Sequence, residues 1–336
     1  MLLKPIRTFL AATLFTVSAC TAVTPAAPVG AQGTPLQIRS SAVPLKLDDP
    51  EARRVGRLIW RGGVELTADS RNFGGWSDLH VSPDGKTLTV ISDEGSWLTA
   101  TVAYDAQGNL ARLTGGQIGS LRGLDGKPLT DKALADAEGL ARQPDGSWLV
   151  SFERRHRIWR YPTLDGTPAA LDLPPDFARQ PNNGGAEALT VLADGRLVVI
   201  SEEYSQRAGS VVGWIGQPGA GGRYTWRTFS YAAIADFQPT AIAQLPDGSL
   251  VTIERAFDFL RGVRCRVMRF ELSQVQPDGT VRPEELARLA SPYAVDNLEG
   301  LAVTMGPRGE TLLWAMSDDN FNPLQRNLLL LFELAK

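Results

Sequence analysis

Short apolar runs separated by turn residues fill most of the chain, and one arrangement of them recurs. In each copy an apolar run leads into a tight turn, a second apolar run follows, and an acidic pair or an acid with an arginine ends the copy. The turn is Asp-Gly in most copies, and Asp-Gly between two apolar runs is the strongest short-range signal for a β-hairpin, because glycine accepts the positive φ of a tight turn. The pattern therefore predicts a chain of repeated hairpins.

Five copies can be counted. Four have Asp-Gly turns, spaced 61, 49 and 53 residues apart, at Asp84, Asp145, Asp194 and Asp247, and the fifth has the altered turn Gly306-Pro307-Arg308-Gly309. The second apolar runs are Leu88 to Ser92, Trp148 to Phe152, Leu197 to Ser201, Leu250 to Ile253 and Leu312 to Ser317. This period suits a four-stranded blade of a β-propeller. Helical periodicity is nearly absent outside 131–137, so the sequence predicts an all-β propeller.

The two ends of the repeat region predict how the ring closes. Arg57 to Leu66 is an apolar run without a hairpin partner, and Leu328 to Phe332 is the last apolar run of the chain. We expect the first to be the outer strand of the last blade, because that pairing removes exposed sheet edges. Five blades follow from the count, and a sixth, degenerate blade that uses Leu36 to Leu47 stays open.

The N-terminus has the pattern of an export signal. Lys4 and Arg7 precede an uncharged apolar run that is too short to span a bilayer. Val17-Ser18-Ala19-Cys20 resembles a bacterial lipobox, and the alternative is a plain signal peptide cut near Ala31. We expect a signal peptide over 1–19, a flexible tether over 20–35 and one propeller domain over 36–336. The protein would be lipid-anchored in the cell envelope and face the periplasm, at the outer membrane in a Gram-negative cell.

Composition narrows the classes of function. A formal net charge of −3 offers no basic field for nucleic acid, so nucleic-acid binding is not expected. With Cys20 lipidated, Cys265 has no disulfide partner and is interpreted as a buried thiol. The two histidines lack a zinc-binding spacing. We expect a monomer with a small-molecule partner, in contact with the membrane only through lipidated Cys20.

Hairpin geometry predicts where the polar residues meet. The start of the first strand and the end of the second lie at the same edge of an antiparallel sheet. In a propeller the first strand lines the axis, so these residues should converge on one mouth of the central channel. They are Ser77, Asp78, Glu138, Glu187, Thr240 and Glu299 from first strands, and Asp93, Glu153, Glu202, Glu254 and Asp318 from second strands.

So many carboxylates need nearby cations, because like charges at close range raise one another's pKa. Candidate cations are Arg154, Arg155, Arg255 and Arg326. The remaining deficit of positive charge suits a hard divalent ion, and Ca²⁺ is favoured over Mg²⁺. The candidate ligands are Asp93, Glu138, Glu187, Glu202, Glu299 and Asp318. For any single acid the alternative is a structural hydrogen bond to the backbone of the adjacent blade. His156 beside arginines is either a phosphate contact or part of a solvated basic turn.

Several blocks of residues carry a resemblance to a known family: Phe73-Gly74-Gly75-Trp76-Ser77-Asp78-Leu79, Ser92-Asp93-Glu94-Gly95, Asp136-Ala137-Glu138-Gly139-Leu140, Ser151-Phe152-Glu153-Arg154-Arg155-His156-Arg157, Asn183-Gly184-Gly185-Ala186-Glu187-Ala188-Leu189, and Ser317-Asp318-Asp319-Asn320-Phe321 with Gln325-Arg326. In this order they resemble the bacterial phytase-like family with esterase-like activity, over about Ile59 to Leu334. The resemblance implies a secreted propeller, loosely related to calcium-dependent phytases, that hydrolyses a phosphoester or a carboxylester.

The leading hypothesis is a metal-assisted phosphoester hydrolase at the channel mouth. Its candidate catalytic residues are Glu138, Glu187, Arg154, Arg255, His156 and Arg326, with the arginines holding phosphate and a carboxylate positioning water. Two alternatives stay open. One is a non-catalytic envelope lipoprotein that binds a ligand or partner through the same residues, and the other is a metal-dependent carboxylesterase or lactonase on the same scaffold.

Overall fold

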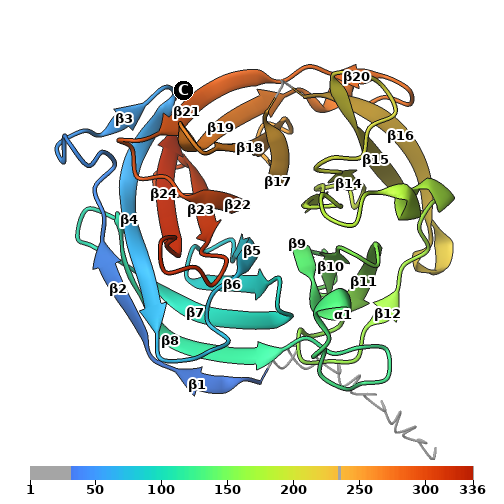
Figure 1. The fold of residues 1–336 in the computed structure, drawn as a ribbon, viewed down its shortest axis with the longest axis horizontal. Helices are drawn as coiled ribbons and strands as arrows, with labels where there is room; N and C mark the ends of the chain where they lie inside the picture. Colours follow the sequence, from blue (N-terminus) through green and yellow to red (C-terminus); the bar gives the residue numbers. More distant parts are fainter. Residues whose placement is uncertain (1–31, 234–235, 336) are drawn as a thin grey trace, which may run out of the picture.

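The computed structural model describes residues 32–233 and 236–335. The predicted signal peptide and Cys20 lie outside the described residues. Five sheets stand around a common centre, as blades of one wheel (Figure 1). The described residues thus confirm an all-β, five-bladed propeller, and none of the described helices is long and apolar enough to span a bilayer.

The strands of each blade follow one another from the rim of the wheel to its axis. In this order blade 1 consists of β1 (Thr34–Leu36), β8 (Leu110–Ser120), β7 (Ser96–Tyr104), β6 (Thr87–Ser92) and β5 (Trp76–Val81). Blade 2 consists of β12 (Ala169–Ala170), β11 (Arg157–Tyr161), β10 (Trp148–Phe152) and β9 (Ala137–Arg142). Blade 3 consists of β20 (Thr280–Val281), β16 (Tyr224–Ala232), β15 (Ser210–Pro218), β14 (Leu197–Ile200) and β13 (Ala188–Val191).

Blade 4 consists of β21 (Glu284–Ala290), β19 (Gly262–Phe270), β18 (Leu250–Asp258) and β17 (Gln238–Gln244). Blade 5 consists of β2 (Ile38–Ala42), β4 (Leu58–Ala68), β24 (Leu328–Leu334), β23 (Thr311–Asp318) and β22 (Asn297–Met305), and β3 (Arg54–Val55) pairs with β4. The helical segments are α1 (Lys132–Ala135) and three 3₁₀ turns, Pro175–Arg179, Ala220–Gly222 and Leu272–Gln274. All five predicted hairpins form, and α1 confirms the short helical stretch.

The ring closes as the sequence predicts. β4, from near the beginning of the chain, pairs antiparallel with β24, from its end, with Glu65 opposite Leu328. The sixth blade is wrong, because the segment proposed for it supplies edge strands instead: β1 joins blade 1 and β2 pairs with β4 in blade 5. These pairings cover the outer edges of the two blades that meet at closure.

Neighbouring blades pack closely around the axis, and each of five buried apolar clusters lies between two of them. The Glu-Gly pairs of the repeat reflect this packing. A Cβ atom on Gly139 would lie 2.8 Å from the carbonyl oxygen of Glu187 in the next blade, and one on Gly300 would lie 3.0 Å from the Cα of Asp78. Glycine follows glutamate in these pairs because the next blade occupies the space of a side chain.

Candidate functional site

In four blades a β-bulge interrupts the pairing of the two innermost strands. It lies near the start of the first strand, at the end of the blade that faces the channel mouth. In blades 1, 4 and 5 the extra residue is Ser77, Thr240 and Glu299, and in blade 2 the bulge spans Glu138 and Gly139. A bulge bends its strand and redirects a side chain. The bulge residues do not all serve the channel, since buried Thr240 donates a 3.0 Å hydrogen bond to the Leu298 carbonyl oxygen of the next blade.

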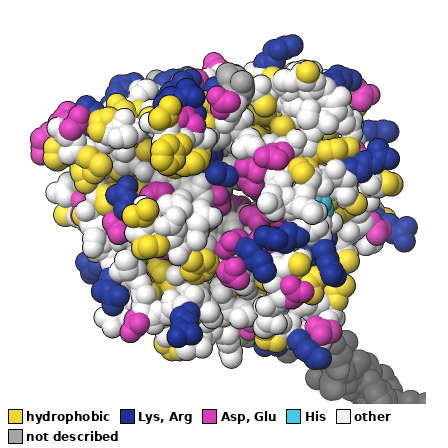
Figure 2. Space-filling view, viewed as in Figure 1, with side chains coloured by type: hydrophobic (Ala, Val, Ile, Leu, Met, Phe, Trp, Pro, Cys, Tyr) yellow, Lys and Arg dark blue, Asp and Glu magenta, His cyan; other side chains and the backbone are white. Residues whose placement is uncertain are grey.

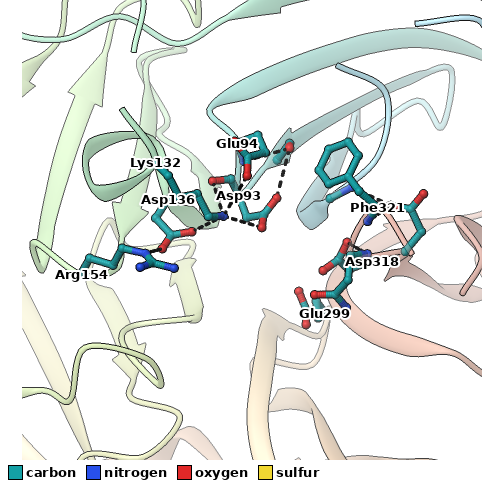
Figure 3. A network of polar contacts seen from close by, with 12 residues as sticks. Asp93, Glu94, Lys132, Asp136, Arg154, Glu299, Asp318 and Phe321 are labelled. Atoms are coloured by element: carbon teal, nitrogen blue, oxygen red, sulfur yellow. Dashed lines mark hydrogen bonds and ion pairs between the residues drawn. The ribbon is translucent and has the colours of Figure 1, made fainter. Parts of the chain in front are cut away.

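Six acids that we call the channel carboxylates gather at this mouth: Asp93, Glu138, Glu187, Glu202, Glu299 and Asp318. Figure 2 shows acidic side chains around the central opening, and in Figure 3 Asp93 faces Glu299 and Asp318 across a shared space. The charge of Asp93 contributes to raising the pKa of both Glu299 and Asp318, although these residues belong to opposite ends of the chain. The structure thus brings the predicted ligands together, and their roles remain predictions.

Burial is the main influence on these acids. It raises the pKa of Glu138 and Glu187 well above the ordinary value, and the charges of neighbouring carboxylates act in the same direction. Burial raises the pKa of Glu299 to about 7, against the opposing effect of Arg255. Burial and then the charge of Glu299 raise the pKa of Asp318 to about 9. Without a bound cation, part of the cluster therefore keeps its protons at neutral pH.

Lys132 and Asp136 are site residues that the sequence reasoning missed. Lys132 Nζ lies 2.6 Å from Asp93 Oδ2 and 2.7 Å from Asp136 Oδ1, and Arg154 pairs with Asp136 on its other side (Figure 3). The available signal was Asp131, whose side chain caps α1 and places Lys132 one helical turn before Asp136. This lysine joins blade 1 to the start of blade 2.

Arg255 is the cation on the other side of the channel. Its Nη2 atom lies 3.0 Å from Glu202 Oε1 and 3.7 Å from Glu299 Oε1, so blade 4 contributes a guanidinium where other blades contribute acids. Asn297 donates a hydrogen bond of 2.7 Å to Glu299 Oε1. Arg255 and Asn297 also line a neighbouring cavity of about 650 Å³ between blades 4 and 5.

Two predicted arginines and the predicted histidine lie apart from the channel carboxylates. Arg326 lines the neighbouring cavity and lies 3.6 Å from Asp296, and Arg155 is exposed to solvent. His156 is half-buried, and its ring and the side chain of Glu153 both pack near Gly185. Burial lowers the pKa of the His156 imidazole, which leaves it neutral at pH 7. Its role as a phosphate contact stays a prediction.

Two acids expected at the mouth, Asp78 and Glu254, have structural partners. Asp78 accepts hydrogen bonds from the backbone N–H of Leu140, at 2.7 Å, and of Leu301, at 3.4 Å, and so links blade 1 to both of its neighbours. Glu254 is fully buried in an ion pair with Arg266. The structural alternative left open for any single acid therefore applies to Asp78, whose donors are backbone N–H groups of the adjacent blades, and Glu254 is neutralised by a buried guanidinium.

The donor set fits a hard cation. Oxygen atoms of Asp136, Glu138 and Glu153 lie within 4.8 Å of one another, although one Glu153 oxygen also accepts a 3.0 Å hydrogen bond from the Gly185 N–H. Glu187 Oε2 is buried, and no described residue donates a hydrogen bond to it. Carboxylate oxygens in an irregular shell suit Ca²⁺ better than Mg²⁺, which requires an octahedral shell. The site thus contains a buried acidic triad that could hold a metal.

Comparisons with solved structures return distant propellers. A putative gluconolactonase is 13% identical, with 90% of this chain and 94% of that chain covered and a TM-score of 0.43. Virginiamycin B lyase from Staphylococcus aureus is 12% identical over 88% and 99% of the chains, with a TM-score of 0.39. An aldose sugar dehydrogenase from Streptomyces coelicolor, solved with PQQ, is 14% identical over 88% and 98%, with a TM-score of 0.42. Similarity at this level carries no function to this chain.

No curated protein matches the chain. A family model does match, over residues 71–321, which is most of the chain and contains all six channel carboxylates, α1 and the neighbouring Arg255. That family is described by the esterase-like activity of phytase, which supports an enzyme that acts on ester bonds. The chain therefore belongs to the phytase-like family.

Proposed function

We propose that this protein is a metal-assisted ester hydrolase that acts on phosphoesters at the mouth of the propeller channel. The observation that carries the proposal is the excess of buried and half-buried acids over cations at the channel mouth. Six channel carboxylates and Asp136 share one space with Lys132, Arg154 and Arg255. Such an excess favours binding of a cation, because each retained negative charge otherwise raises the pKa of its neighbours.

Ca²⁺ is the proposed ion, with Glu138 and Glu187 as its first ligands. Glu138 is 9% exposed and lies beside the carboxylates of Asp136 and Glu153, and Glu187 has a buried oxygen without a donor among the described residues. When bound, the ion would supply Lewis-acid polarisation of an ester oxygen. Arg154 and Arg255 are placed on either side of the carboxylates to hold an anionic group. Their guanidinium groups stay charged throughout, so they stabilise charge without changing protonation.

Two acids are suited to move protons. In the metal-free protein Glu299 has a pKa of about 7 and exists in both protonation states near neutrality, which suits a general base that orients a water molecule. In the metal-free protein Asp318 has a pKa of about 9 and keeps its proton at neutral pH, which makes it the candidate to donate to a leaving oxygen. The pair thus divides base and acid roles between neighbouring strands, β22 and β23.

Purified protein lacking the signal segment tests this proposal on a panel of phosphomonoesters and carboxylesters, with a Ca²⁺ chelator and with Ca²⁺ restored. We expect phosphoester hydrolysis that the chelator abolishes and Ca²⁺ restores. Hydrolysis that is indifferent to the chelator would contradict the metal's role, and turnover of carboxylesters alone would favour the carboxylesterase alternative.

A double substitution, Glu138→Gln with Glu187→Gln, separates a site role from a structural one. It should abolish both the hydrolysis and the Ca²⁺-dependent rise in melting temperature, while the fold persists. Asp84→Asn, at an exposed hairpin turn far from the channel mouth, is the matched control and should keep both. Saturable ligand binding by the wild-type protein without any turnover would support a non-catalytic binding protein instead.

The setting of this activity is also a proposal. Export through the N-terminal signal, lipid attachment at Cys20 and a monomeric state would place one channel mouth per molecule in the cell envelope. Metabolic labelling with a radioactive fatty acid should label the wild-type protein and leave Cys20→Ala unlabelled. Labelling of both would contradict the lipid anchor.

A further inference from the structure

The cavity beside the channel mouth has a composition that the hydrolase proposal does not use. It has a volume of about 650 Å³ and lies between blade 4 and blade 5. One part of its lining is polar, with Arg255, Asn297, Asp296 and Arg326. The rest includes the apolar side chains of Leu47, Phe257, Val263, Tyr293, Val295 and Leu324.

The β18–β19 hairpin contributes Phe257 and Val263 to the apolar part. β18 runs nine residues to Asp258, whereas the second strands of blades 2 and 3 have five and four. Arg255 and Phe257 both line the cavity because alternate residues of a strand share a face. Beyond them the hairpin tip exposes Phe259 and Leu260 by 93% and 92%. The strand therefore passes from the channel cation directly into exposed apolar residues.

A second loop brings apolar surface to the same cavity. Leu324 lies in the connection between β23 and β24 and is 89% exposed, and Phe257 on the opposite wall is 65% exposed. Exposed apolar side chains that gather around a concave surface mark a binding site, because their clustering in water is unfavourable without a partner. Figure 2 shows hydrophobic side chains on the surface beside the central opening.

The two ends of the cavity differ in charge. Arg255 and Asn297 contact Glu202 and Glu299 of the channel, so the polar end is continuous with the candidate site. Arg261 and Arg326 add guanidinium groups to the lining, where Asp258 pairs with Arg261 and Asp296 with Arg326. A ligand that complements this surface has an anionic or ester group at the channel and an apolar group that extends toward Phe257 and Leu324.

We propose that this cavity binds the apolar part of an amphiphilic ester, an acyl chain or a comparable hydrocarbon group, while the ester lies at the channel mouth. In naming a substrate class the inference rests on the proposed hydrolase function, although the binding itself needs no catalysis. Burial of each additional methylene in the cavity should raise the affinity about fourfold, until the cavity is filled.

Unreactive ligands test the binding separately from turnover. Alkylphosphonates of increasing chain length, titrated calorimetrically into the Ca²⁺-loaded protein, should bind more tightly with each methylene and then reach a plateau. Phe257→Ser and Leu324→Ser should flatten this series and leave hydrolysis of a short-chain ester unchanged. Leu124→Ser is the matched control, since Leu124 is 53% exposed and is not part of the cavity lining. Thermal melts of the three variants verify that each is folded.

The outcomes separate the two proposals. Chain-length-dependent binding without hydrolysis of any ester supports the cavity inference and contradicts the hydrolase. Hydrolysis together with an affinity that does not change with chain length overturns the cavity inference alone. A flat series combined with sedimentation on phosphatidylcholine vesicles that Phe257→Ser and Leu324→Ser abolish would also overturn it, because the apolar residues would then contact a membrane.

Discussion

Replacing Asp318 by asparagine should change how the stability of the metal-free protein depends on pH. Asp318 is 3% exposed, and burial followed by the charge of Glu299 raises its pKa to about 9. The unfolded chain has the ordinary value of 3.8. Between these values the folded state holds a proton that the unfolded state has lost, so the wild-type protein loses stability as the pH rises.

The size of the effect follows from this difference in protonation. Each pH unit inside the window costs about 1.4 kcal/mol for one such group, so the change from about pH 5 to about pH 8 amounts to roughly 4 kcal/mol. Asp318→Asn removes this contribution. It keeps an oxygen that can accept the 2.7 Å hydrogen bond from the Asn320 N–H, so the local turn persists. The free energy of unfolding of the variant, relative to that of the wild type, should therefore rise by roughly that amount between about pH 5 and about pH 8.

Urea unfolding of both proteins in the presence of chelator measures the difference at several pH values. Asp84→Asn serves as control, because hydrogen bonding to Ser82 and Lys86 lowers the pKa of Asp84 and its carboxylate stays ionised in both states across this range. Its stability should run parallel to that of the wild type. If Asp318→Asn also runs parallel, Asp318 is ionised in the folded protein and the electrostatic account of the cluster is wrong.

Two further substitutions test the packing that positions the site. Gly139→Ala places a Cβ 2.6 Å from Ser151 Oγ in its own blade and 2.8 Å from the Glu187 carbonyl oxygen in the next blade, and should cost about 1–3 kcal/mol in chemical unfolding. Gly219→Ala, whose Cβ would meet no atom closer than 3.5 Å, should stay within about 0.5 kcal/mol. Equal costs would contradict the close contact between blades. Arg266→Met leaves Glu254 buried without its ion pair and should cost about 3–5 kcal/mol by the same measurement. A cost below about 1 kcal/mol would show that this ion pair does not stabilise blade 4.

The fold could be predicted because its signals are local. Each Asp-Gly turn and its two apolar runs specify a hairpin without reference to the rest of the chain, and their period indicates a blade. The pairing of segment 36–47 was harder to predict, because the position of an edge strand depends on the strand with which it pairs. Its pairing with β8 and β4 depends on how the two ends of the ring come together.

The site was predictable as a group of acids and not residue by residue. Antiparallel geometry places Glu138 and Asp78 at the same edge, but whether each faces the channel depends on the bulge and on the donors of the next blade. Lys132 escaped prediction because it lies on a helical turn outside the repeat. Such details depend on contacts between blades, which a repeat read one copy at a time does not contain.

The channel carboxylates are not needed to hold the blades of the propeller together. Apolar clusters already join every pair of neighbouring blades, and the acids that do connect blades have donors: Asp78 accepts from Leu140 and Leu301. Glu138 is 9% exposed and Glu187 is half-buried, and no described residue donates a hydrogen bond to the buried Glu187 Oε2. A buried carboxyl group without a partner destabilises a fold. The unpartnered Glu187 Oε2 and the nearby Glu138 therefore support the proposed cation, which would add positive charge at this channel mouth.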